Sequence, residues 1–517
     1  MNSVEPVFDI ANFRKWKESS MERHDIYNFE SKIDYILDRT PTEKESSYLL
    51  EVFFFIPESL QINKESYSKE QFFLDLNNRI RFKTPQMTIQ GLLDEQNKLS
   101  PIYVILKKLK EIEYGEITHE TNIRIEREIR LLACIVKVSL RDQFSFILTF
   151  YQKLKKQGNI DAVISSFLDD IEKLELKMNF LRETFSISQI PYKLREALQY
   201  ADEYISLQIK TWIAQAIKGL EKQIDNNIRS KMIQIIEREQ DFRKSINSTL
   251  ILEENSENEA FTYYESILKK YVQGVLYLEK KKKDPKSRSL ELLYSFAAGF
   301  AMFLSLFLTV LLLAAYDVNS IPFIILAVVI YIFKDRIKDI FRGISQKAVG
   351  LVFPDQRVDI VDKFYQVTIG ESREKVNFIE WEDVPDEILR VRSSSNKSPL
   401  EEEGKPEVVL SYMQKITLLN EKIDEIHKRK KDLSNIIRFN IRDFLKYADD
   451  PIQHELLWNN KTTDVEDLLI SKVYHLNIVL KLSSYKGKEV KRLFFKKFRV
   501  ILDQKGIKRI EEPDISL

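Results

Sequence analysis

The chain has 517 residues, 31% of them charged, and a formal net charge of +1 at pH 7. This balance excludes a global basic field, so no nucleic-acid partner is expected. The only cysteine, Cys134, excludes an internal disulfide and a cysteine-based zinc site, and its apolar surroundings (LLACIVKV) are typical of a core residue.

Residues 1–98 combine strand and helix patterns. The segments 29–38 and 48–57 are rich in Ile, Tyr, Val and Phe, and the polar connection between them predicts a β-hairpin. Ser68, followed three residues later by Gln71, is a capping-box pattern that opens a helix.

Residues 99–285 are predicted to form a helical bundle. Its clearest element is a long helix over 191–248, in which apolar side chains recur every three or four residues. The mean spacing exceeds 3.5 residues, which favours packing in a bundle; an extended stalk or oligomerisation helix is the alternative. After a polar break at 253–260, a last helix over 261–281 is expected to lead almost directly into a membrane segment.

An uncharged run of 25 residues extends from Leu292 to Tyr316, and a second run of 16, residues 318–333, follows Asp317. A helix rises about 1.5 Å per residue and the hydrocarbon core is about 30 Å thick, so the first run can cross a bilayer. The second reaches only about 24 Å and would cross with local thinning. The pair predicts a transmembrane helical hairpin over 290–334; a buried hairpin in a soluble core is the alternative.

Basic residues flank both runs, whereas the turn between the runs has none. The positive-inside rule therefore predicts a multi-pass protein of the inner (plasma) membrane with both termini in the cytoplasm. The first ten residues do not resemble a signal peptide, so the hairpin would act as the insertion signal. The residues predicted to contact lipid headgroups are Lys280, Lys281, Lys282, Lys283, Lys334 and Arg336.

Three small residues of the first run, Ala297, Ala301 and Ser305, are spaced four apart. This small-xxx-small spacing predicts helix packing within the membrane and is compatible with a homo-oligomer. Neither run contains Asp, Glu, Lys, Arg or His, which counts against a proton relay or a charged selectivity ring within one copy.

Residues 350–517 are predicted to form a β-rich antiparallel domain, a sandwich or a sheet backed by helices, with a flexible loop at 393–407. In residues 474–482 apolar and polar side chains alternate, which predicts a strand with one buried face, followed by a turn near Gly487. The basic and aromatic segment 491–499 suggests either RNA stacking or, as we favour, a returning strand with a buried aromatic face and a solvated basic face.

Residue patterns that carry chemistry are scarce. Neither glycine-rich phosphate-binding fingerprint is present, nor H-E-x-x-H, so no cofactor or metal is expected. Two groups of acidic residues and histidines could be imagined as metal sites, but a turn or helix cap and a solvated helix face, respectively, are the interpretations we favour. They are Asp449, Asp450, His454 and Glu455, and His119, Glu120, Glu126 and Glu128.

Three stretches, 52–73, 331–339 and 502–512, together with the position of the hairpin, resemble uncharacterised bacterial membrane proteins with two spans and large cytoplasmic arms. The resemblance implies no activity, cofactor or catalytic residue.

The sequence thus predicts an α+β membrane protein with a mainly helical N-terminal arm that includes a small β-hairpin, a transmembrane helical hairpin and a β-rich antiparallel C-terminal domain. The expected function is non-enzymatic: a scaffold or sensor whose cytoplasmic arms bind an unknown cytoplasmic protein partner. The hairpin would anchor the protein in the lipid bilayer. One alternative is an oligomeric membrane effector or pore triggered through the arms. Another is a hydrolase or nuclease with a dispersed site, which predicts a polar pocket where distant Asp, Glu, His or Lys side chains converge.

Overall fold

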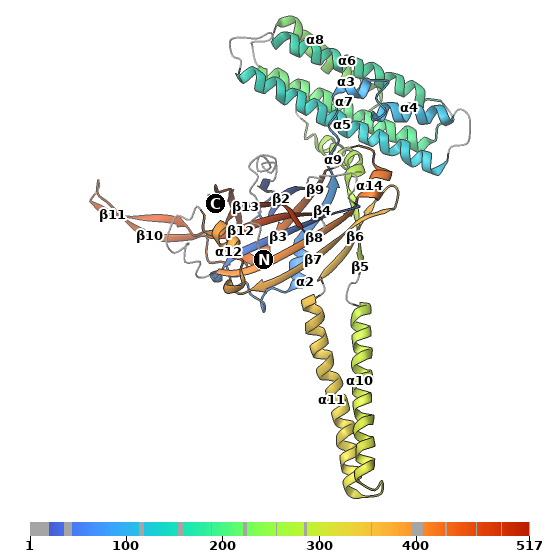
Figure 1. Cartoon of the computed structure of the whole chain (residues 1–517). Helices are drawn as coiled ribbons and strands as arrows, with labels where there is room; N and C mark the ends of the chain where they lie inside the picture. The colour runs from blue at the N-terminus through green and yellow to red at the C-terminus, as the bar shows by residue number, and fades with distance from the viewer. Residues whose placement is uncertain are drawn as a thin grey trace.

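The computed structural model describes residues 20–35, 44–112, 118–153, 160–187, 189–220, 225–254, 256–283, 287–352, 354–394, 407–429, 432–461, 463–486 and 489–515. Most of the predicted loop 393–407 and the turn at Gly487 lie outside these residues. The fold is α+β, with helices concentrated in the N-terminal half and an antiparallel sheet rich in C-terminal strands. A helical bundle lies at one end of the sheet and a two-helix hairpin projects from the other (Figure 1).

The β-part is built from two antiparallel sheets and a separate two-stranded ribbon. The eight-stranded sheet has the order β14-β13-β12-β3-β8-β7-β6-β5, and the four-stranded sheet has the order β1-β2-β9-β4. The strands are β1 (Ser20–Arg23), β2 (Asn28–Tyr35), β3 (Glu45–Pro57), β4 (Leu76–Phe82), β5 (Leu278–Lys283), β6 (Gln356–Asp362), β7 (Thr368–Ile379), β8 (Glu407–Leu419), β9 (Leu433–Asn440), β10 (Ile452–Asn459), β11 (Asp464–Ser471), β12 (Tyr474–Lys486), β13 (Glu489–Asp503) and β14 (Gly506–Glu511).

The N-terminal strands are completed by C-terminal strands. β3 pairs with β8 and β12, while β2 pairs with β1 and β9. The predicted hairpin between the segments 29–38 and 48–57 is therefore wrong, since these strands lie in different sheets. The regions 1–98 and 350–517, which the sequence suggests are separate, contribute strands to the same sheets.

The two faces of β3 enter different cores. Tyr48, Leu50, Val52 and Phe54 belong to the main core, which extends through the four-stranded sheet into the bundle. The alternate residues, including Phe55, pack in a second cluster with Ile388 and Val391 of α12 (Asp386–Ser393). The alternation arises because successive side chains of a strand point to opposite faces of its sheet.

The predicted pair of C-terminal strands is confirmed by β12 and β13, but the basic face of β13 is not solvated. Lys497 is fully buried, and its Nζ donates hydrogen bonds to the carbonyl oxygens of Arg392 and Ser394. These carbonyls lie at the C-terminal end of α12, where a helix leaves acceptors without intrahelical partners. The buried lysine therefore stabilises the end of the helix that covers this face of the sheet.

The bundle contains α3 (Ile89–Leu93), α4 (Pro101–Ile112), α5 (His119–Lys153), α6 (Ile160–Phe185), α7 (Tyr192–Leu220), α8 (Asn226–Ser245) and α9 (Glu259–Gln273). The single long helix predicted over 191–248 is two helices, α7 and α8, which pack against each other. Asp225 caps the second one by accepting a hydrogen bond from the backbone N–H of Asn227 at 3.2 Å. Apolar periodicity continues through the break because both helices bury a stripe.

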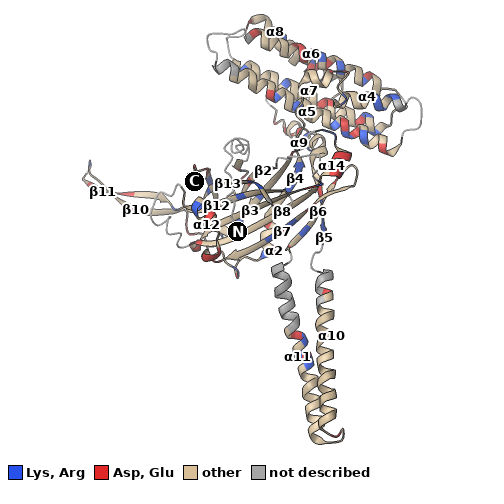
Figure 2. Cartoon of the chain, in the orientation of Figure 1, with Lys and Arg blue, Asp and Glu red and all other residues tan. Residues whose placement is uncertain are grey.

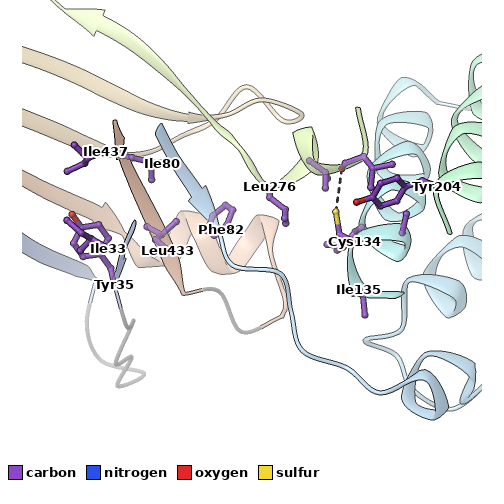
Figure 3. Packing of buried hydrophobic residues seen from close by; sticks show 14 of the residues in the cluster. Ile33, Tyr35, Ile80, Phe82, Cys134, Ile135, Tyr204, Leu276, Leu433 and Ile437 are labelled. Atoms are coloured by element: carbon purple, nitrogen blue, oxygen red, sulfur yellow. Dashed lines mark hydrogen bonds between the residues drawn. The ribbon is translucent and has the colours of Figure 1, made fainter. Parts of the chain in front are cut away.

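The bundle is joined to the sheet by a continuous core. Cys134 is buried, as expected, and its thiol donates to the carbonyl oxygen of Val272 at 3.5 Å. Burial raises the pKa of this thiol to about 12. Figure 3 shows apolar side chains extending from the four-stranded sheet past Phe82 and Leu276 to Cys134 and Tyr204 in the bundle.

The predicted last helix, 261–281, is wrong at its C-terminal end. α9 ends at Gln273, a 3-10 turn (Gly274–Leu276) follows, and the chain then enters β5, which pairs with β6 along the edge of the large sheet. The bundle is therefore linked to the helical hairpin through a sheet strand, and not through a direct helical connection.

The helical hairpin consists of α10 (Ser287–Ala315) and α11 (Ile321–Val352), which pack against each other. Among the described residues, one helix is long and apolar enough to cross a membrane, with a 22-residue span at Tyr294–Ala315 and a mean hydropathy of 2.4. The second predicted span does not meet this standard. In α11 the uncharged part ends at Phe333 and is followed at once by Lys334, Asp335 and Arg336.

A close backbone approach joins the two sheets at Gly506, which has a φ of +133°. A Cβ atom there would lie 2.2 Å from the carbonyl oxygen of Ile26, the same oxygen that accepts a hydrogen bond from the N–H of Ile507 at 2.7 Å. The eight-stranded and four-stranded sheets share one core and form a β-sandwich. We expect Gly506→Ala to lower the free energy of unfolding of this sandwich by about 1–3 kcal/mol, measured by denaturant titration.

The matched control is Gly274→Ala, because Gly274 has a φ of −54° and no atom lies within 4 Å of a Cβ built there. That variant should be neutral or slightly stabilising, by up to about 1 kcal/mol. Equal losses in both variants would contradict a specific role for the glycine at 506.

Candidate functional site

The four lysines predicted to contact lipid headgroups lie on β5, and three of them have partners within the sheet. Lys283 Nζ lies 2.6 Å from Asp359 Oδ2, Lys280 Nζ lies 3.7 Å from Glu374 Oε1, and Lys281 Nζ donates to Gln366 Oε1 at 2.9 Å. Burial lowers the pKa of Lys280, and the Glu374 carboxylate opposes this effect. Much of this basic run therefore serves the sheet edge, and contact with lipid stays a prediction.

The remaining predicted residues lie on the hairpin. Lys334 and Arg336 lie near the middle of α11, and Lys334 Nζ lies 4.8 Å from the centre of the Tyr331 ring. Ala297 and Ala301 are each 1% exposed, and Ser305 is half-buried. Because α10 packs against α11, this burial comes from α11. The small residues therefore already make a helix–helix contact within one chain.

Of the α5 residues predicted to form a solvated face, His119 and Glu120 are exposed, but the other two are not. Glu126 and Glu128 are buried and paired with cations: Glu126 with Arg130 and with Lys193 at 3.2 Å, and Glu128 with Arg127 at 3.3 Å and with Arg429 at 2.7 Å. The helix packs here against other elements, so the carboxylates are taken out of water and need partners.

The group near residue 450 lies at the base of the β10–β11 ribbon. Asp449 Oδ2 lies 2.5 Å from Lys472 Nζ and accepts a hydrogen bond from the Tyr474 hydroxyl at 3.1 Å. His454 and Glu455 are exposed on β10. Within the ranges that the structure describes, no group of three or more His, Cys, Asp or Glu side chains could hold a metal ion.

A cavity of about 890 Å³ lies where the bundle meets the sandwich. Two bundle helices present one face each to it. Tyr103, Val104, Lys107 and Lys108 come from α4, and Glu120, Arg124, Arg127, Glu128 and Leu131 come from α5. Positions three and four apart share one side of a helix, which is why these residues face the same space. Tyr365 and Val367 in the β6–β7 turn and the segment Glu425–Arg429, which begins at the end of α14 (Asn420–Ile426), also line it.

A buried network crosses from bundle to sheet on one side of this cavity. Arg127 on α5 contacts His427 Nδ1 through its Nη2, and His427 Nε2 lies 3.0 Å from Asp362 Oδ2 at the end of β6. A guanidinium only donates hydrogen bonds, so His427 Nδ1 must accept and Nε2 must carry the proton that is donated to Asp362.

Asp362 is held as a carboxylate. Burial acts to raise its pKa, but hydrogen bonds from His427 and from the backbone N–H of Tyr365, with the positive charge of Arg127, outweigh this and lower the pKa. The carboxylate also accepts from the N–H of Phe364 at 2.9 Å, which fixes the β6–β7 turn at the cavity wall. Arg127 thereby links the bundle to this turn.

The charge of the cavity wall is strongly unbalanced. Among its described residues eight are lysine or arginine, whereas three are glutamate. The cations are Lys83, Lys98, Lys107, Lys108, Arg124, Arg127, Lys428 and Arg429, and the carboxylates are Glu120, Glu128 and Glu425. An excess of positive charge in a concave, partly desolvated site attracts anions.

Two features of the described wall bear on its chemistry. Both ring nitrogens of His427 are engaged, so neither is placed to accept a proton from a bound substrate. The described wall contains no serine, threonine or cysteine that could act as a nucleophile. The wall is a polar pocket in which Lys, Arg, Glu and His side chains from distant parts of the chain converge, and the hydrolase alternative stays a prediction.

Sequence reasoning missed this site. Glu120, Arg124, Arg127 and Leu131 have the spacing of one helix face, and the residues from His427 onward form a basic run, HKRKK. These signals were visible, but nothing in the sequence indicated that residues 300 positions apart, such as Arg127 and His427, would meet.

Comparison of the chain with protein-family models, with curated proteins and with solved structures gives no match.

Proposed function

We propose that this protein is a scaffold or sensor whose bundle and sandwich bind partners on the cytoplasmic side of a membrane, held there by the α10–α11 hairpin. The observation that carries the proposal is the exposed apolar surface of this hairpin. Large side chains along both helices are exposed, among them Leu306 at 57%, Val310 at 63% and Ile325 at 58%. Such a surface in water would be a strong driver of association.

Neither a soluble core helix nor a signal sequence fits the properties of α10. A core helix of a soluble protein would be mostly buried, yet only 17% of the apolar window of α10 is buried. A signal sequence would lie near the N-terminus, whereas α10 begins at Ser287. The long uncharged stretch of the hairpin in Figure 2 contrasts with the mixed charges of the bundle and the sandwich.

The connections of the hairpin support a hairpin that enters and leaves from the same side. α10 follows β5 and α11 precedes β6, and these strands are antiparallel neighbours in which Lys283 lies opposite Arg357. The span of α10 measures about 33 Å at 1.5 Å per residue, enough for the hydrocarbon core. The shorter uncharged part of α11 would need Lys334 and Arg336 to extend toward the headgroups.

Replacing residues 287–352 by a short Gly/Ser turn should convert the protein from a membrane-bound to a soluble form with an intact sheet, because a short turn can join β5 to β6. The measurement is the distribution between carbonate-washed membranes and supernatant, with circular dichroism of the soluble form as the folding check. A shortened chain that still sediments with membranes would refute the anchor.

A point substitution gives a second, less disruptive test. Leu306→Asp should reduce the membrane-bound fraction, because an aspartate near the centre of a spanning helix costs about 2.5–3.5 kcal/mol. Leu176→Asp is the matched control, since Leu176 is 68% exposed on α6 of the bundle. Equal behaviour of the two variants would show that the surface of α10 is in water.

A further inference from the structure

We propose that the cavity between the bundle and the sandwich binds a multiply phosphorylated small molecule with an aromatic ring, for which a nucleoside triphosphate is the simplest representative. The site is assigned by its charge, its buried donors, its aromatic wall and its position. It does not depend on the hairpin being in a membrane.

The charged residues of the cavity wall form two sets, one buried within ion pairs and one exposed at the rim. Inside, Arg429 is paired with Glu128 through two hydrogen bonds, of 3.1 and 2.7 Å, and also donates to the carbonyl oxygen of Leu99 at 2.6 Å. At the rim, Lys98, Lys107 and Lys428 are exposed, and Arg124 is half-buried. The inner pairs fix the wall, while the exposed cations add positive charge to its outer part. A ligand with several negative charges neutralises them together.

A buried donor also points to a ligand. The Nε of Arg127 is buried without a hydrogen-bond partner, although the side chain is only 8% exposed and its other nitrogens are engaged. Buried donors without a partner are uncommon in folded proteins, and an unfilled ligand or water position is a common reason. A phosphate oxygen that reaches this nitrogen from the cavity, which Arg127 lines, would supply the missing acceptor.

The size and the aromatic wall select the ligand class. A volume of about 890 Å³ lies within the range of small-molecule sites, roughly 300–1,000 Å³, and exceeds what a free phosphate would fill. Phe82, Tyr103 and Tyr365 line it, and the guanidinium of Arg127 lies 5.7 Å from the centre of the Tyr365 ring. Cations for phosphates and flat rings for a base together match a nucleotide.

Phosphate recognition here would use side chains, because the chain has no glycine-rich phosphate loop. Arginine and lysine can take that role through charge-assisted hydrogen bonds to phosphate oxygens.

The position of the cavity favours a soluble ligand over a lipid headgroup. Val275 and Leu276, just before β5, and Tyr365, just after β6, line the cavity, whereas the opposite ends of β5 and β6 lead into the hairpin. The cavity-lining residues and the hairpin therefore lie at opposite ends of these two strands. Figure 1 shows the bundle and the hairpin at opposite ends of β5 and β6. Because the wall combines bundle and sandwich residues, a bound ligand would strengthen the contact between these two parts.

The test uses the full-length chain in nanodiscs made of zwitterionic lipid, titrated with ATP, GTP or inorganic triphosphate by calorimetry. A nucleoside triphosphate should bind, bind more tightly than inorganic triphosphate, and slow hydrogen exchange in α4, α5 and residues 425–429. The double variant Lys107→Gln/Arg124→Gln should bind about 10-fold or more weakly, since it loses two charge-assisted contacts. Higher salt should weaken binding by the wild-type chain more than by the variant.

The control is Lys173→Gln, which removes an exposed lysine from α6 away from the cavity and should leave the affinity unchanged. Circular dichroism establishes that each variant is folded. No nucleotide binding, or binding that the double variant retains, would overturn the proposal. So would inorganic triphosphate binding as tightly as ATP, or binding only in nanodiscs that contain phosphoinositide. Ligand affinity and hydrogen exchange at the cavity are measured independently of the membrane-bound fraction, and the same titration can be made on the full-length chain in detergent, so the two proposals are tested separately.

Discussion

Phe439→Ala should destabilise the β-sandwich by about 3–5 kcal/mol, the largest loss that we expect from any single substitution considered. Phe439 lies on β9 of the four-stranded sheet and is fully buried. Its ring centre lies 5.3 Å from that of Phe54 on β3 and 5.3 Å from that of Phe72 on α2 (Lys69–Asp75). Truncation would open a cavity between the two sheets and remove both aromatic contacts.

The measurement is hydrogen exchange of the β3 and β9 amides in full-length protein, which reports the opening free energy of this region separately from that of the bundle. Phe439→Leu keeps most of the volume and should lose no more than about 1.5 kcal/mol. Phe180→Ala on α6, where the ring is 47% exposed, should leave these amides unaffected. Similar losses from Phe439→Ala and Phe180→Ala would contradict the role of Phe439 as the contact between sheets.

Bundle stability should fall by about 3 kcal/mol as pH rises from below 4.5 to above 7, because of one buried carboxyl group. Burial raises the pKa of Glu239 on α8 to about 7 from an ordinary value of 4.5, and the carboxylates of Glu175 and Asp202 act in the same direction. A raised folded-state pKa means that the folded state holds its proton more tightly. The free energy of unfolding of the bundle is therefore highest below pH 4.5, where Glu239 is protonated in both states, and falls as pH rises through 7. Each pKa unit corresponds to about 1.4 kcal/mol.

Glu239→Gln should remove most of this dependence, making the bundle more stable than wild type at pH 8 and about equal to it near pH 4. Hydrogen exchange of α7 and α8 amides across this pH range, corrected for intrinsic rates, is the measurement. Glu237→Gln, an exposed substitution on the same helix, should change stability by no more than about 0.5 kcal/mol. If the opening free energy of the wild-type bundle stays constant between pH 4.5 and 8, ionisation of Glu239 does not destabilise the bundle and the prediction is wrong.

The break between α7 and α8 shows what apolar periodicity cannot predict, which is where one helix ends and the next begins. The stripe over 191–248 correctly indicated buried helix, yet α7 ends at Leu220 and α8 begins at Asn226. Two helices that pack against each other each need an apolar stripe, so the periodic pattern continues while the chain reverses. The Asp225 cap was the available local signal for the break.

By itself, the sequence determined the properties that depend on near neighbours. The alternation in β12, the core position of Cys134, the capping of α2 by Ser68 and the long uncharged run in α10 are all local in origin. Helical and strand periods and caps involve residues within a few positions of one another, so they can be read directly.

Only the tertiary structure decided which strands pair and which charges meet. β3 lies between β8 and β12, and Arg127 reaches His427 and Asp362, because the chain returns to the same sheet after building the bundle and the hairpin. Pairing between distant segments depends on the total burial and hydrogen bonding of the whole fold, which no local window contains. The basic cavity arises from this return of the chain, and its ligand is what the proposed titration identifies.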